Sequence, residues 1–90
     1  MTGYHVTTHR KLARYNETGG ILPPVRFWRS PETAEAWRRK TGRDLILVVD
    51  VETAYPMPDH QPPMMAWWTP FLVRTWTRLM AEVDAKAGQE

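Results

Sequence analysis

The sequence predicts one small α+β domain in which a small split β-sheet has flanking helices. Its 90 residues fit a single domain, since domains usually contain about 50 to 250 residues. Segments with strand patterns alternate with segments that carry helix caps and helical spacing of apolar residues. Leu45 to Val49 form a continuous run of β-branched residues and leucine, which is typical of a strand buried on both faces. This run is expected at the centre of the sheet.

The chain begins with the pattern of a short strand followed by a helix. Tyr4 to Thr7 can form the strand, and Thr7 or Thr8 can then cap a helix from about His9 to Asn16. A double glycine at positions 19–20 is expected to end this helix, because glycine readily adopts the backbone conformation that stops one.

A second strand and a second helix are expected before the apolar run. Residues 21–24 contain two prolines and predict a turn, and residues 25–28 alternate partly as a strand does. Ser30 followed by Pro31 is a strong helix start, since serine caps well and proline suits the first helical position. Gly42 suits the position just beyond the end of that helix.

The second half of the chain is interrupted by proline. Five of the eight prolines fall between Pro56 and Pro70, so residues 56–63 are expected to be an extended connection without regular structure. Met64 to Trp68 can form one more strand. Thr69-Pro70 repeats the cap-plus-proline pattern ahead of an expected amphipathic helix from about Phe71 to Lys86, which would dock on the sheet.

Composition and charge narrow the classes of function. The formal net charge is only +2, so nucleic acid is permitted as a partner but not indicated. The chain has no cysteine, which excludes disulfides and thiolate metal sites and favours a reducing compartment. It also has neither an apolar leader segment nor a stretch of about 20 apolar residues. We therefore expect a cytoplasmic protein without a membrane span.

The order of short motifs resembles that of a known family. These motifs are Tyr4-His5-Val6-Thr7, the double glycine, Ile21-Leu22-Pro23-Pro24, Val25-Arg26-Phe27-Trp28, Ser30-Pro31-Glu32 and the strand from Leu45 to Val51. Together they are similar to the N-terminal half of the ADP-ribosyltransferase-like superfamily, particularly its small bacterial and phage members. The resemblance covers roughly residues 4 to 52, or 4–55 with the chain that follows. It implies a reduced form of that fold, which pinches NAD⁺ between the halves of a split sheet.

The resemblance also implies a set of cofactor-binding residues. His5 would bond the adenosine ribose, and the backbone beside it would hold the nicotinamide amide. Aromatic side chains would sandwich the nicotinamide ring, for which Phe27, Trp28 and Trp37 are the candidates. The complete set expected to bind NAD or a related nucleotide is His5, Thr7, Arg26, Trp28, Ser30 and Trp37. Arg10, Arg26 and Arg29 could meet a pyrophosphate through paired hydrogen bonds.

Several of these residues also have an ordinary structural interpretation. His5 can be satisfied by a neighbouring carbonyl group, and Trp28 and Trp37 can simply pack in the core. Basic residues between Arg38 and Arg43 favour a helix C-terminus electrostatically, although they could also bind phosphate or RNA. His5, His9 and His60 with Asp59 match the spacing of no familiar metal site, so no metal is expected.

One departure from the family affects the expected activity. The transferases supply a glutamate from a late strand, and Met64 to Trp68 contains no acidic residue. Asp50 and Glu52 remain the alternatives, so the sequence leaves enzymatic activity open. The leading hypothesis is an NAD- or ADP-ribosyl-binding domain, catalytically degenerate or not, in bacterial or phage conflict or regulation. The alternative is a non-enzymatic module that binds a protein partner or forms a homodimer through the Trp- and Met-rich run.

Overall fold

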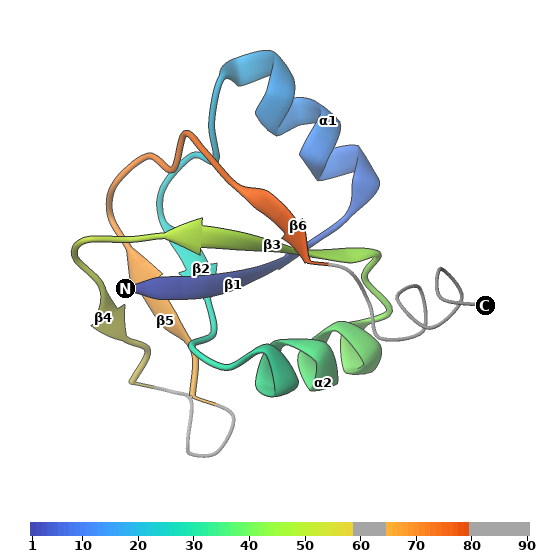
Figure 1. Cartoon of the computed structure of the whole chain (residues 1–90), viewed down its shortest axis with the longest axis vertical. Coiled ribbons are helices and arrows are strands. Elements are labelled where there is room, and N and C mark those ends of the chain that lie inside the picture. The colour runs from blue at the N-terminus through green and yellow to red at the C-terminus, as the bar shows by residue number, and fades with distance from the viewer. Residues whose placement is uncertain (59–64, 80–90) are drawn as a thin grey trace.

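The computed structural model describes residues 1–58 and 65–79, which form an α+β domain as predicted (Figure 1). Its elements follow one another in this order: β1 (Thr2–Thr7), α1 (His9–Thr18), β2 (Val25–Phe27), α2 (Pro31–Thr41), β3 (Leu45–Asp50), β4 (Tyr55–Pro56), β5 (Trp67–Thr69) and β6 (Thr77–Leu79). The strands make two antiparallel three-stranded sheets, of which one is long and one is short. No helix in these two ranges is long and apolar enough to cross a membrane.

The long sheet has the order β1-β3-β6 and contains the predicted apolar run as its middle strand. β1 and β3 pair antiparallel along their whole length, with His5 opposite Leu47. Leu47 is fully buried, Leu45, Ile46 and Val49 are nearly so, and Val48 is half-buried. The expectation of a central strand buried on both faces is therefore confirmed.

The short sheet has the order β2-β5-β4 and is joined to the long sheet at one point. There Tyr4 and Trp28 exchange two backbone hydrogen bonds, of 2.7 and 2.9 Å. Gly3 on β1 faces the ring of Phe27 on β2 so closely that a Cβ at Gly3 would overlap it. The two sheets thus contact each other through a residue that can only be glycine if Phe27 keeps its place.

Both expected helices of the first half form, with the caps that their sequences predict. The Thr8 hydroxyl accepts a hydrogen bond from the Lys11 backbone N–H, and α1 ends at Gly19 in the left-handed conformation. Ser30 caps α2 in the same way, with Pro31 as the first helical residue. In Figure 1, α1 and α2 lie on opposite sides of the strands, and α2 packs against β1 and β3.

The predicted C-terminal helix from Phe71 is wrong over the part that can be compared. Val73 instead pairs with Ile21, and β6 pairs with the free edge of β3. The helical spacing of apolar residues was misleading for two reasons. The backbone groups of this segment form their hydrogen bonds with an open sheet edge, and valine and threonine are favoured in strands. Residues 80–86 of the predicted helix lie outside the described ranges.

Two further expectations for the second half need correction. Thr69 does not begin a helix: it is the buried last residue of β5, and its hydroxyl accepts a hydrogen bond from the Phe71 backbone N–H. Tyr55–Pro56, at the start of the proline-rich stretch, pairs with β5 as an edge strand, where proline is tolerated because one side needs no donor. The expected strand from Met64 to Trp68 is shifted to β5, Met64 itself lying beyond the described ranges together with residues 59–63.

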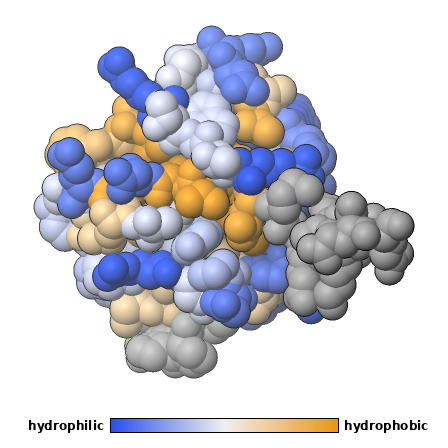
Figure 2. Space-filling view, in the orientation of Figure 1, coloured by the Kyte–Doolittle hydropathy of each residue, from blue (hydrophilic) through white to orange (hydrophobic). Residues whose placement is uncertain are grey.

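Apolar side chains form two core clusters, one on each side of the long sheet. The larger cluster gathers Val25, Phe27 and Leu47 with neighbours from β3, and the smaller one gathers Val6, Trp28 and Ile46. Figure 2 shows apolar side chains across the middle of one face, between the two helices, with hydrophilic residues around them. A pocket lies at the edge of this core, beside α1.

Candidate functional site

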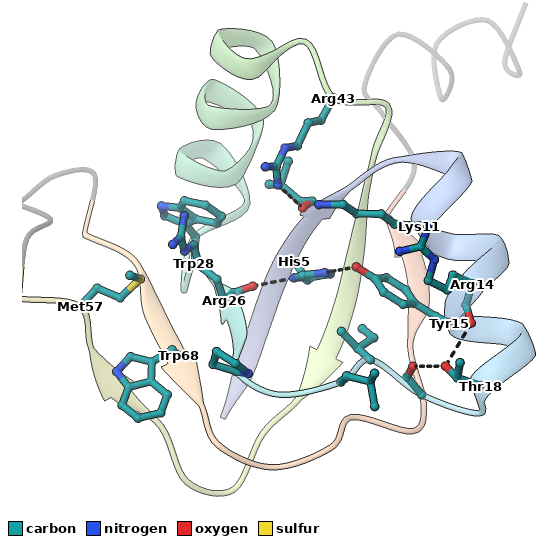
Figure 3. Close-up of a pocket in the computed structure, with 15 residues that line it drawn as sticks. His5, Lys11, Arg14, Tyr15, Thr18, Arg26, Trp28, Arg43, Met57 and Trp68 are labelled. Carbon is teal, nitrogen blue, oxygen red and sulfur yellow. Dashed lines mark hydrogen bonds between the residues drawn. The ribbon is translucent and has the colours of Figure 1, made fainter.

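A pocket of about 690 Å³ opens between α1 and the strands of both sheets (Figure 3). This volume is in the range of small-molecule sites, which occupy about 300–1,000 Å³. The polar and charged side chains of the lining come from β1, α1, β2 and the turn after α2. They are His5, Lys11, Arg14, Tyr15, Thr18, Arg26 and Arg43. Its larger apolar side chains are Ile21, Leu22, Trp28, Met57 and Trp68.

His5 lies in the wall of the pocket with both ring nitrogens hydrogen-bonded. Its Nδ1 is 2.6 Å from the Arg26 carbonyl oxygen, and its Nε2 is 3.0 Å from the Tyr15 hydroxyl. Burial lowers the pKa of His5 below 6.5; the Arg26 carbonyl opposes this shift, while the charges of Lys11 and Arg43 add to it. His5 is therefore neutral at pH 7, as a histidine satisfied by a neighbouring carbonyl would be.

Tyr15 brings α1 into contact with the long sheet. Its hydroxyl is 3.0 Å from His5 and 3.1 Å from the hydroxyl of Thr7, which is fully buried. Its ring lies edge-on to Trp76, with the ring centroids 6.1 Å apart. Tyr15 is half-buried and lines the pocket, and its hydroxyl group points to His5 in the pocket wall (Figure 3).

Four cationic side chains surround the pocket, and the described residues give its lining no carboxylate. Lys11 and Arg14 come from one face of α1, Arg26 from β2 and Arg43 from the turn before β3. Within residues 1–58 and 65–79, none of the four forms an ion pair, although Arg43 donates a hydrogen bond to the Val6 carbonyl. Unpaired positive charges that converge on a concave site favour anionic ligands.

Two indole rings belong to the lining, in addition to the rings of His5 and Tyr15. Trp28 is 1% exposed and packs on Trp37, with the ring centroids 5.3 Å apart. Trp68 is half-buried and packs at the same centroid distance on Tyr55, which is 48% exposed. The pocket thus has one indole in its inner wall and one toward its rim.

Three of the six predicted cofactor-binding residues line this pocket, namely His5, Arg26 and Trp28. Thr7 lies behind the lining, where it contacts Tyr15. Ser30 caps α2, and Trp37 packs between Trp28 and the ammonium group of Lys40. Neither side chain lines the pocket, so the structure gives both a role in packing and capping.

Of the three arginines considered for a pyrophosphate, only Arg26 lines the pocket. Arg10 is exposed on α1, and the Arg29 guanidinium lies over the ring of Trp67, 5.5 Å from its centroid. Sequence reasoning had already given Arg43 a possible role in phosphate binding, but it missed Lys11, Arg14, Tyr15, Thr18, Met57 and Trp68. The spacing of Lys11, Arg14, Tyr15 and Thr18 by three and four residues was the available signal, because such positions share one helix face.

Neither alternative carboxylate from the sequence stands in the pocket lining. Asp50 has a side chain that is 90% exposed and faces the N-terminal ammonium group of Met1, at 3.5 Å. Glu52 is likewise exposed and outside the lining. In the described part of the chain, no three His, Cys, Asp or Glu side chains are grouped so that they could hold a metal ion.

The lining thus combines positive charge with flat aromatic rings, and the imidazole of His5 is already committed to two hydrogen bonds. Comparisons with protein-family models, with curated proteins and with solved structures find no match to this chain.

Proposed function

We propose that the chain binds an ADP-ribosyl nucleotide, NAD⁺ or ADP-ribose, in the pocket beside α1. The observation that carries this proposal is the composition of the lining: among the described residues it has four cations and no carboxylate, together with two indole rings. An ADP-ribosyl group carries a pyrophosphate, two riboses and a flat base, so its chemistry fits both parts of the lining. The resemblance of residues 4 to 52 to the ADP-ribosyltransferase-like superfamily adds support from the sequence.

The charge of the pocket favours the pyrophosphate as the main anchor. Guanidinium groups donate paired hydrogen bonds to phosphate oxygens, and Arg14, Arg26 and Arg43 provide three of them. Lys11 lies one helical turn before Arg14 on α1 and adds a fourth charge. Because the nicotinamide ring of NAD⁺ is itself cationic, this lining is expected to prefer ADP-ribose to NAD⁺.

The indole rings suit the flat bases of such a ligand. Stacking of a base on an aromatic side chain contributes about 1–3 kcal/mol to binding. Trp68 is the better placed of the two, since it is half-buried whereas Trp28 is almost completely covered by the core.

Binding is better supported than bond cleavage. Transfer of an ADP-ribosyl group develops positive charge on the ribose as nicotinamide leaves, and a nearby carboxylate would stabilise that charge. Over residues 1–58 and 65–79, the lining provides cations in place of such a carboxylate. We therefore propose a nucleotide-binding domain as the function of the described site.

The proposal is tested by calorimetric titration and thermal unfolding with ADP-ribose, NAD⁺ and inorganic pyrophosphate. A ligand at 100 times its dissociation constant should raise the free energy of unfolding by about 2.7 kcal/mol. Lys11→Gln combined with Arg14→Gln should abolish most of this effect. Arg10→Gln is the matched control, because Arg10 lies on the same helix but outside the lining. Absence of binding by all three ligands to the wild type would disprove the proposal.

A second candidate function, protein binding, is favoured by a different observation. Met65, Trp67 and Trp68 are half-buried in or beside β5, but Leu22 and Phe71 are 66% and 61% exposed. These two residues lie on the segments that the Ile21–Val73 pairing brings together. Sedimentation velocity over a range of concentrations tests self-association, and Leu22→Ser with Phe71→Ser should reduce it.

A further inference from the structure

The hydrogen bonds around His5 have only one consistent set of directions. The Arg26 carbonyl oxygen can only accept, so the proton of neutral His5 is on Nδ1. Nε2 then carries a lone pair and must accept from the Tyr15 hydroxyl, at 3.0 Å. Because Tyr15 has a single hydroxyl proton, the Thr7 hydroxyl must donate to the Tyr15 oxygen, at 3.1 Å. The chain of donors therefore runs from Thr7 through Tyr15 and His5 to Arg26.

This direction decides what the network offers to a ligand. Both ring nitrogens of His5 are used, so the imidazole has no free donor or acceptor for the pocket. The proton of Tyr15 is also used, but its oxygen retains room for one more hydrogen bond as an acceptor. Tyr15 lines the pocket, whereas Thr7 is completely buried behind it. Toward a ligand, the network thus presents a single neutral acceptor.

That acceptor stands beside the cationic side chains. Lys11 and Tyr15 are four residues apart on α1 and share one face of the helix, and Arg14 immediately precedes Tyr15. Figure 3 shows the Tyr15 hydroxyl pointing at His5, with Lys11 and Arg14 on the same side of the pocket. A ligand suited to this arrangement carries a hydroxyl group close to a phosphate group, as the riboses of an ADP-ribosyl group do.

We propose that Tyr15 is a specificity-determining residue of the pocket, whose oxygen accepts a hydrogen bond from a ribose hydroxyl of the bound ADP-ribosyl ligand. His5 and Thr7 act through Tyr15 as positioning residues and do not touch the ligand. This inference rests on the proposed function and adds the group that distinguishes an ADP-ribosyl ligand from a bare anion. A phosphate oxygen, which offers only lone pairs, would be repelled at this point.

The test compares ADP-ribose with inorganic pyrophosphate, which has no ribose hydroxyl. Tyr15→Phe removes one oxygen and leaves the ring packed on Trp76. It should weaken ADP-ribose binding about tenfold, the loss of roughly one hydrogen bond, and change pyrophosphate binding by less than about twofold. Tyr4→Phe is the matched control, since Tyr4 lies outside the lining, and it should change neither affinity. Pyrophosphate is titrated as a competitor of ADP-ribose, so that weak binding is also measured.

The positioning role of His5 has its own readout. Nitrogen NMR of the His5 ring should report the proton on Nδ1 in both the wild type and Tyr15→Phe. His5→Gln should lower the ratio of ADP-ribose to pyrophosphate affinity in the wild type, but not in the Tyr15→Phe background, because it acts through Tyr15. An equal effect of His5→Gln in the two backgrounds would overturn the positioning role.

The remaining outcomes separate this inference from the proposed function. If Tyr15→Phe binds ADP-ribose as tightly as the wild type, or loses both ligands equally, the role of Tyr15 is disproved. The proposed function still stands in that case if Lys11→Gln with Arg14→Gln abolishes ADP-ribose binding. If the wild type binds neither ADP-ribose nor pyrophosphate, the proposed function fails and the inference fails with it.

Discussion

The two sheets differ in how their strands are held together. In the long sheet, β1 and β3 pair over six residues each and form a continuous backbone ladder. In the short sheet, β5 pairs over three residues with β2 and over two with β4. Such short pairings depend on large side chains, and Phe27 is indeed fully buried beneath them.

Each of the two sheets provides one wall of the candidate site. The long sheet holds His5 and Thr7 in a regular frame, where they pair with Leu47 and Leu45 of β3. The short sheet and its flanks bring Arg26, Trp28 and Trp68 to the opposite wall. A short sheet with few backbone hydrogen bonds opens more easily than a long one, so its wall should respond more to a ligand.

The largest expected effect is the loss of the contact between the two sheets. Phe27→Ala should lower the free energy of unfolding by about 3–5 kcal/mol, because the ring is 0% exposed and fills the space beside Gly3. Phe71→Ala is the matched control and should change it by less than about 0.5 kcal/mol, since Phe71 is 61% exposed. Chemical denaturation measures both. Similar values for the two variants would mean that the short sheet contributes little to the core.

The next largest expected effect is the loss of ligand affinity when the indole of Trp68 is removed. Trp68→Ala should weaken ADP-ribose binding by about 1–3 kcal/mol through lost stacking, as measured by calorimetric titration. Trp67 is its neighbour on β5, but it packs against the larger core cluster and lies outside the pocket lining. Trp67→Ala should therefore destabilise the fold and leave the affinity of the folded protein unchanged. A reversed pattern would place the ligand on the other face of the short sheet.

Ser30 tests whether a predicted site residue is structural. Ser30→Ala should lower the free energy of unfolding by about 1 kcal/mol, because its hydroxyl caps α2 at the Thr33 backbone N–H. ADP-ribose affinity should not change, since Ser30 is outside the pocket lining. Ser30→Asp, which retains a capping oxygen, should restore stability. An affinity loss in Ser30→Ala with unchanged stability would return Ser30 to the site.

The smallest effect, on the long sheet, requires only a change of pH. Burial lowers the pKa of His5, so the unfolded chain takes up this proton before the folded protein does. The stability that depends on neutral His5 is fully present above pH 6.5 and is lost as the pH falls from there through the folded-state pKa. As the pH falls through this interval, the free energy of unfolding should therefore decrease more for the wild type than for His5→Gln. Chemical denaturation at several pH values measures both. Parallel pH profiles would show that protonation of His5 does not oppose folding.

Sequence patterns predicted the first half of the chain well because its signals are local. Thr8 and Ser30 cap their helices, and Gly19 and Gly42 end them with positive φ. His5, Arg26 and Trp28, which the sequence analysis expects to bind a nucleotide, do line one pocket, and their role in binding stays a prediction. The helical spacing of Lys11, Arg14 and Tyr15 also indicates that they share one face of α1, which is a signal for this part of the site.

By itself, the sequence determined the α+β class, both helices and the central buried strand, because caps, turns and apolar runs act over a few neighbouring residues. Tertiary structure alone decided that residues 77–79 pair with β3 and that Trp68 faces the same pocket as His5. It also decided the donor direction through Thr7, Tyr15 and His5. Pairing partners and hydrogen-bond networks join residues that are distant in the chain, and local spacing carries no information about which of them will meet.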